Sequence, residues 1–242
     1  MTRAVVFPRL LPPKGTPQRL VLVGVAAASL LLVGPFFFWF FTWFGWSLDP
    51  ARVTEALALP VRPAHATQML LQMGEKLSRN DQTMRPYYPR VLALAKHPDT
   101  DLRRTVAWFM GEDPSSPEFH QALLSLLRDP APMVRRRAAL SLANFHDPAA
   151  RAELTRILAP YTVTAELSGQ VEFRIQPRDI AKAVTVVARI GGQDIAAGVP
   201  GTVGRQLVPN GETVRTGQAV LEILPDPSGV REARRALSLL AN

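Results

Sequence analysis

Hydrophobic and polar positions follow three different patterns along the chain. Residues 20–46 contain no charged side chain. In residues 64–79, and again in residues 85–158, apolar side chains recur every three or four positions, which predicts amphipathic helices. In residues 161–175 and 183–190, apolar and polar residues alternate or β-branched residues follow one another, which predicts strands. We therefore expect an N-terminal apolar span, a helical region and a β domain.

The uncharged segment, residues 20–46, has the length of a transmembrane helix. At about 1.5 Å per residue it would reach about 40 Å, more than the ~30 Å hydrocarbon core of a bilayer. A cleavable signal peptide is the alternative, but its apolar core normally ends in small residues, whereas residues 36–46 are rich in Phe and Trp. The preceding tail is basic and lacks acidic residues, so it should stay in the cytoplasm. This pattern predicts a single-pass protein of the cell inner membrane, with its C-terminal domains in the periplasm.

The helical region contains an internal repeat. Residues 97–107 align with residues 129–139 without a gap, and both copies hold a Pro-containing turn followed by a helix. A helix precedes each copy, at residues 88–96 and 117–128, and a further one opens at Pro148. Because such helical hairpins cannot bury their apolar faces alone, they should stack on one another.

The turn is followed in both copies by Leu or Val and then by an arginine, Arg103 or Arg135. This pattern resembles HEAT repeats in their short bacterial form, over residues 85–158. The repeat is shorter than the usual length of about 40–47 residues. The resemblance implies a small α-solenoid, and stacks of this kind usually bind proteins.

The net charge of +8 and the run Arg135-Arg136-Arg137 raise the possibility of nucleic-acid binding. Basic and acidic residues are nearly balanced over residues 85–158, however, and this does not fit a phosphate-binding stripe. We interpret the arginine of the repeat as the partner of an Asp in an inter-repeat turn, and its neighbours as solvent-facing. No nucleic-acid partner is expected.

No motif for catalysis, cofactor binding or metal binding stands out. The chain has no cysteine, which excludes thiolate sites and disulfides. Its histidines have no metal-binding spacing, and His97 and His146 adjoin turns; the four are His65, His97, His120 and His146. The glycines between residues 191 and 204 precede no helix, as a phosphate-binding loop would require. The sequence therefore predicts a protein that is not an enzyme and has no cofactor, although a dispersed catalytic site stays open.

The β region consists of two matching halves. Five positions correspond at one constant offset: Val163, Ala165, Gly169, Val171 and Ile175 match Ile195, Ala197, Gly201, Val203 and Leu207. The helical repeat has the same offset, which we interpret as a coincidence because the two regions differ in periodicity. In the second half Gly211 and Gly217 should provide turns with positive φ. The side chains expected in the core are Val203, Val208, Val214, Leu221 and Ile223.

The second-half pattern, with Gly211, Gly217 and Gln218 at its turns, resembles biotinyl/lipoyl-type domains and the equivalent domain of bacterial membrane-fusion (periplasmic adaptor) proteins. The resemblance implies a flattened sandwich of two quasi-symmetric halves. Carrier domains of this type hold a modifiable lysine at the hairpin between the halves, which aligns with residues 191–194. That hairpin has no lysine, and Lys182 falls in the preceding segment. An unmodified, adaptor-type domain is therefore expected.

These observations predict a membrane-anchored, multidomain fold. Its parts are a basic cytoplasmic tail (1–19), a transmembrane helix (20–46), a connector with an amphipathic helix (47–83), HEAT-like repeats (84–160), a biotinyl/lipoyl-like β domain (161–226) and a C-terminal helix (227–242). The expected function is that of a non-catalytic scaffold or accessory subunit of a larger bacterial membrane protein complex, with integral membrane subunits as partners. The alternatives are a periplasmic adaptor of an export system and an enzyme with an unrecognised site.

Overall fold

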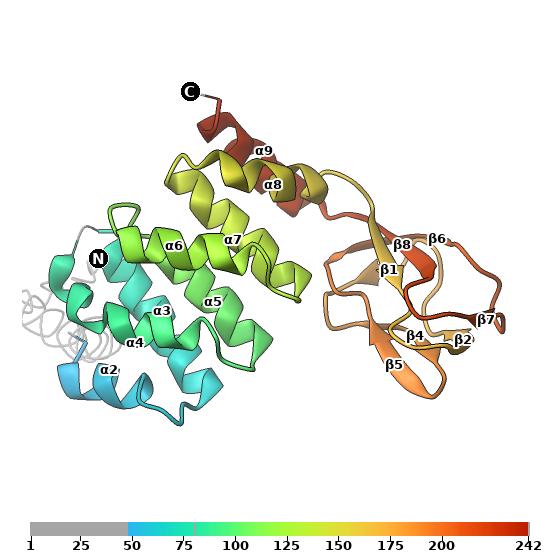
Figure 1. The fold of residues 1–242 in the computed structure, drawn as a ribbon, viewed down its shortest axis with the longest axis horizontal. Helices are drawn as coiled ribbons and strands as arrows, with labels where there is room; N and C mark the ends of the chain where they lie inside the picture. The colour runs from blue at the N-terminus through green and yellow to red at the C-terminus, as the bar shows by residue number, and fades with distance from the viewer. Residues whose placement is uncertain (1–47, 80, 242) are drawn as a thin grey trace, which may run out of the picture. The chain divides into compact units, whose positions relative to one another are not determined.

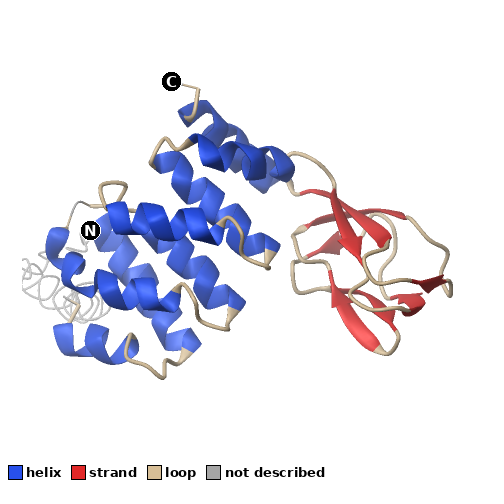
Figure 2. Cartoon of the chain, in the orientation of Figure 1, coloured by secondary structure: helices blue, strands red, loops and turns tan. Residues whose placement is uncertain are grey.

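The computed structural model describes residues 48–79 and 81–241, in which a series of helices is followed by a β sandwich and one last helix (Figures 1 and 2). The helices before the sandwich are α2 (Pro50–Ala56), α3 (Pro63–Leu77), η1 (Gln82–Tyr87), α4 (Tyr88–Leu94), α5 (Thr100–Met110), α6 (Pro117–Leu126), α7 (Pro132–Asn144), η2 (Pro148–Ala150) and α8 (Arg151–Ile157). The last helix is α9 (Pro227–Leu239). The helical region followed by a β domain is as predicted.

The membrane-anchored fold class and the inner-membrane localisation need correction. The tail 1–19 and the predicted transmembrane helix 20–46 lie outside the described residues. In the part of the chain that the structure describes, no helix is long and apolar enough to cross a membrane. The longest, α3, has 15 residues, about 22 Å at 1.5 Å per residue, and one of its faces is exposed and polar. What the structure supports is therefore helical repeats and a β-sheet domain, without an assigned membrane span.

The helices form successive hairpin-like pairs, in which the second helix of each pair packs on the second helix of the next. Helix α3 packs on α5, and α5 packs on α7 (Figure 1). The core between them is apolar, because residues one helical turn apart, such as Leu102, Val106 and Met110 of α5, all face inward and are fully buried. Leu142 of α7, which aligns with Met110 in the repeat, is also fully buried. This confirms the stacking that the repeat predicts.

Small residues let these second helices approach closely. A Cβ atom at Gly74 of α3 would lie 2.4 Å from the Trp108 ring of α5, and one at Gly111 would lie 2.5 Å from the Ser141 hydroxyl of α7. The Ser141 hydroxyl donates a 2.8 Å hydrogen bond to the carbonyl oxygen of Ala107. The order of the stack is thus set by steric fit as well as by apolar burial.

The stack extends beyond the repeat visible in the sequence. Helix α3 adds a pair with α2 at one end, and at the other end α9 packs against both α7 and α8. Helix α9 thereby takes the place of the second helix of the last pair, and the β sandwich is inserted between its two helices. Two side chains at the start of this last pair contact the end of α9. Nδ1 of His146 lies 2.9 Å from the carbonyl oxygen of Leu239, and Arg151 donates a 3.0 Å hydrogen bond to the carbonyl oxygen of Leu240.

The inserted β domain has two four-stranded antiparallel sheets. One has the order β1 (Tyr161–Thr164), β8 (Ala219–Pro225), β6 (Gly201–Gln206), β3 (Ile180–Ala181). The other has the order β5 (Gln193–Ala196), β4 (Val186–Ile190), β2 (Gly169–Phe173), β7 (Thr213–Val214). If β1, β2, β3 and β4 are exchanged with β5, β6, β7 and β8 in that order, every strand pairing of one sheet becomes a pairing of the other. The sandwich therefore has quasi-two-fold symmetry, and its two structural halves are the two halves that match in the sequence.

Equivalent backbone contacts recur in the two halves. The N–H of Gly211 donates to the carbonyl of Val171 at 2.7 Å, and the N–H of Arg178 donates to that of Val203 at 2.8 Å. Gly211 has a φ of 88°, and Arg178 has a φ of 79°. The turn therefore needs the left-handed conformation in both halves, although only one half provides a glycine.

The core of the sandwich is filled by alternating inward residues of both sheets. All five predicted core side chains are buried: Val203, Val208, Val214, Leu221 and Ile223. Gly217 has a φ of 82°, as expected for its turn. Leu207 is a difference between the halves, because it is 36% exposed whereas its counterpart Ile175 is buried.

Candidate functional site

An Asp in the turn before the first helix of a pair is a recurring feature of the stack. The carboxylates of Asp81, Asp113 and Asp147 each accept a hydrogen bond from the backbone N–H two residues later, at 3.0, 3.0 and 2.8 Å. This local bond folds the chain back between successive pairs. These acids are therefore part of the scaffold of the turns.

A second recurring contact links the first helix of a pair to the next of these turns. The hydroxyl of Tyr88 on α4 donates to Asp113 at 2.7 Å, and Nε2 of His120 on α6 lies 2.6 Å from Asp147. Tyr88 and His120 occupy the same position in successive repeats. The His120 ring also stacks on Phe145, with 5.3 Å between ring centroids. Two different aromatic side chains thus link the first helix of a pair to the Asp of the next turn.

The arginine of the repeat binds within its own pair and to the next pair, but the Asp that Arg103 contacts lies in the turn inside the pair α6/α7 and not between two repeats. Arg103 makes a buried bidentate pair with Asp129, at 2.7 and 3.0 Å, and donates to the carbonyls of His97 and Pro98. The hydrogen bond to Asp129 raises the pKa of Arg103. Arg135 donates in the same way to the carbonyls of Asp129 and Pro130. Its carboxylate partner is different, because Glu153 lies 3.9 Å away.

The two arginines after Arg135 were expected to face solvent, and this is wrong. Arg136 is half-buried and its guanidinium lies 5.9 Å from the ring centroid of Tyr161, at the start of the β sandwich. Burial lowers the pKa of Arg136. Arg137 is half-buried and pairs with Glu232 of α9 at 3.1 Å. The run joins α7 to the elements that come after the repeat, which no local pattern could indicate.

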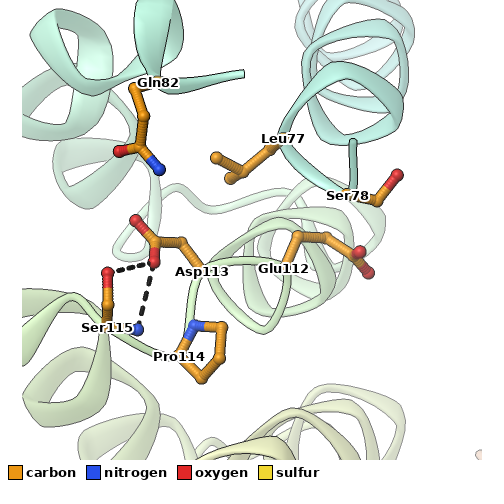
Figure 3. Close-up of a pocket in the computed structure, with 7 residues that line it drawn as sticks. All are labelled: Leu77, Ser78, Gln82, Glu112, Asp113, Pro114 and Ser115. Carbon is orange, nitrogen blue, oxygen red and sulfur yellow. Dashed lines mark hydrogen bonds between the residues drawn. The ribbon is translucent and has the colours of Figure 1, made fainter. Parts of the chain in front are cut away.

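A pocket of about 310 Å³ lies between two successive inter-repeat turns (Figure 3). It is lined by Leu77 and Ser78 at the end of α3, Gln82 of η1, and the turn Glu112, Asp113, Pro114 and Ser115. In Figure 3 the side chains of Leu77 and Gln82 point toward Asp113, and the carboxyl group of Glu112 points away from it. The pocket thus combines a small apolar wall with amide, hydroxyl and carboxyl groups.

The two carboxyl groups of the pocket differ in their environments. Burial acts to raise the pKa of Asp113, but hydrogen bonds from Ser115 and Tyr88 outweigh it and lower that pKa. Arg85, at 3.8 Å, favours the same ionised form. Burial raises the pKa of Glu112, and Arg137 opposes it only in part. Asp113 is therefore a fixed anion, whereas Glu112 is the group that a cationic or hydrogen-bond-donating ligand would stabilise.

The hairpin between the two halves of the sandwich has no lysine. Ile190 pairs directly with Gln193, and the two intervening residues, Gly191 and Gly192, have φ values of 53° and 87°. This is the pair of left-handed residues that a two-residue hairpin prefers. Lys182 lies instead in the turn between β3 and β4, where its backbone N–H donates to the Thr185 hydroxyl at 2.9 Å.

The histidines lie apart from one another in roles belonging to turns and helix ends. His97 accepts from the N–H of Asp99 at 3.1 Å, while His146 binds the end of α9. Among the described residues, no group of three or more His, Cys, Asp or Glu side chains could hold a metal ion. His97, His120 and His146 therefore make contacts within the stack, whereas His65 is exposed on α3.

Residues 88–167 match the family model of HEAT repeats. The match begins at α4 and covers the pairs α4/α5 and α6/α7 and helix α8, as predicted for the repeats, and it ends just after β1 of the sandwich. No curated protein matches the chain.

Proposed function

We propose that this chain is a non-catalytic scaffold that binds another protein through the pocket between its inter-repeat turns. The observation that carries the proposal is the position of this pocket between the turns at Asp81 and Asp113, where the stack brings distant residues together. HEAT repeats often mediate protein interactions. The partner group that suits the pocket is a basic or amide side chain, because Glu112 is partly buried and Arg137 offsets its burial only in part.

The polar groups around the pocket favour binding over chemistry. Asp113 already accepts from Tyr88 and from both the N–H and the hydroxyl of Ser115. A carboxylate held in this way is a poor proton acceptor, because its lowered pKa keeps it ionised and weakly basic. Asp113 is therefore a fixed part of the pocket wall, against which a partner side chain can pack.

The test is site-specific photo-crosslinking in cells that make the protein naturally. A photo-reactive residue at Pro114, an exposed wall of the pocket, should give a discrete cross-linked protein, and Glu112→Gln should reduce its yield. The matched control carries the photo-reactive residue at Thr155, an exposed position on α8. Equal products from both positions, or none from Pro114 while the protein is folded, would refute the pocket as a binding site.

We also propose that the β sandwich is a biotinyl/lipoyl-type domain that carries no cofactor. The two quasi-symmetric four-stranded sheets support the resemblance, and the Gly191-Gly192 hairpin supports the absence of attachment, since biotin and lipoate are linked through a lysine amine. An intact-mass measurement should show neither group. A mass increment of either one on Lys182 would overturn this part of the proposal.

A further inference from the structure

The outer face of α9 carries three arginines on one stripe. Arg231, Arg234 and Arg235 are exposed, and they lie opposite Ala233 and Ala236, the buried residues through which α9 packs. Their spacing of three and four residues places them side by side on the helix surface. Because α9 is the last helix of the stack within the described residues, this stripe is the end face of the solenoid.

The stripe differs from the other charged surfaces of the helices, where opposite charges are interleaved. None of its three arginines forms an ion pair with a residue that the structure describes. Elsewhere most helix arginines have carboxylate partners: Arg85 with Asp113, Arg103 with Asp129, Arg104 with Asp101, Arg137 with Glu232, and Arg156 with Glu153.

The acids nearest in sequence to the stripe are already engaged. Glu232 accepts from Arg137 at 3.1 Å. Asp226 caps the start of α9 by accepting from the N–H of Gly229 at 2.9 Å, and it also binds the Ser228 hydroxyl. The hydrogen bonds from Ser228 and Gly229, with a smaller contribution from Arg231, lower the pKa of Asp226. Neighbouring like charges at this spacing disfavour the helix slightly, so the stripe is not explained by the stability of α9.

We propose that this arginine stripe is a docking surface for an acidic segment of a partner protein. Guanidinium groups bind carboxylates in a bidentate manner, and three of them along one helix face match Asp and Glu residues spaced along a partner chain. A polar end face also excludes a further stacked repeat or a second copy docked by apolar contact. Nucleic acid fits less well, because phosphate contacts supply most of the non-specific affinity and three arginines can neutralise only a few phosphates. This surface is separate from the pocket and does not depend on it.

The experiment measures binding of a fluorescent Glu-rich peptide to the full chain by anisotropy at low salt. The triple variant Arg231→Gln, Arg234→Gln, Arg235→Gln should weaken binding about tenfold, with an unchanged unfolding midpoint. The control removes three exposed arginines elsewhere, by Arg90→Gln, Arg128→Gln and Arg215→Gln, and should leave the affinity within about twofold of the parent chain.

Equal losses in both triple variants would mean that net charge alone attracts the peptide, and they would overturn the proposal. Failure of the parent chain to bind the peptide would overturn it as well. A single-stranded oligonucleotide of equal charge is the competing probe. If it binds more tightly than the peptide and is released by the α9 substitutions, the stripe is a nucleic-acid surface and the proposal is wrong. Should the Gln variant unfold, Lys substitutions at the same positions retain the charge and should retain most of the binding.

Discussion

The helical stack and the β sandwich are both made by doubling a unit of about the same length, yet they use it in different ways. The pairs α4/α5 and α6/α7 follow one another along the stack, so that α5 of the first pair packs on α7 of the second. The halves of the sandwich are related by a quasi-two-fold axis, so each half pairs its strands with strands of the other half. An open stack leaves two end faces to be covered, whereas the two sheets of the sandwich cover each other's apolar inner faces.

This difference explains where the unusual contacts of the molecule lie. In the stack, the position one repeat after Asp129 is Tyr161, which has no carboxylate. The carboxylate near Arg135 is instead that of Glu153, at 3.9 Å. The end is covered by α9, whose outer face is polar. In the sandwich, one departure from symmetry lies in a turn, where Arg178 stands in place of a glycine. Substitutions should therefore have wider effects in the stack than in the sandwich.

The largest effect should come from removing α9. A chain that ends after Ala159 loses the partner of α7 and α8, and we expect its helical region to lose about 3 kcal/mol or more of unfolding free energy. Replacing residues 161–225 by a short Gly-Ser linker should retain the stability of the helical region. Tyr161 and Ile223 are neighbours in one sheet, so the distance that the linker must span is small. Urea unfolding followed by circular dichroism measures both. Equal stability of the two variants would show that α9 is not part of the stack.

Asp129→Ala should destabilise the stack by about 3–5 kcal/mol, because it leaves the buried guanidinium of Arg103 without its carboxylate. Arg104→Ala is the matched control, since the Arg104–Asp101 pair is exposed and should be worth less than about 1 kcal/mol. Thermal or denaturant unfolding compares them. Similar losses for both variants would contradict the assignment of the Arg103–Asp129 pair as the main link between successive turns.

Leu142→Ala should cost about 2–5 kcal/mol, because the side chain is fully buried between helices. Leu140, two residues earlier on α7 and half-exposed, provides the control, and Leu140→Ala should cost clearly less. Unfolding midpoints in guanidinium would distinguish them. A loss below about 0.5 kcal/mol at Leu142 would mean that α7 is not packed as a repeat.

The smallest effects are expected in the turns of the sandwich. Gly211→Ala should destabilise by about 1 kcal/mol, because a side chain is placed at a φ of 88° although no atom blocks it. Arg178→Gly, at the symmetry-related position with a φ of 79°, should have the opposite sign and stabilise by less than about 1 kcal/mol. Differential scanning calorimetry measures both shifts, and shifts of the same sign would show that the two turns are not equivalent.

Sequence patterns alone indicated the repeat, the doubling of the β region and part of its core. These features are local or periodic: a turn with Pro and Arg, inward residues at alternate strand positions, and glycines where φ must be positive. The prediction of a membrane-anchored fold relied on residues 20–46, which lie outside the described residues, and the described helices are too short and too amphipathic to support it.

The candidate pocket could not be found in this way, since its lining residues are scattered from Leu77 to Ser115 and become neighbours only when α3 and α5 stack. The same holds for the equivalence of Tyr88 and His120, whose ring chemistry differs although each binds an Asp of the next turn.

The sequence by itself determined the periodicities, and with them the element types, the repeat offset, the buried faces and the missing lysine of the hairpin, because each depends on residues close together in the chain. Only the tertiary structure decided that α9 completes a helix pair begun at α8. The whole β sandwich separates these two helices in the chain. The contacts of α9 with α7 and α8, such as Arg137 with Glu232 and Arg151 with the end of α9, require the inserted domain to bring its own two ends close together.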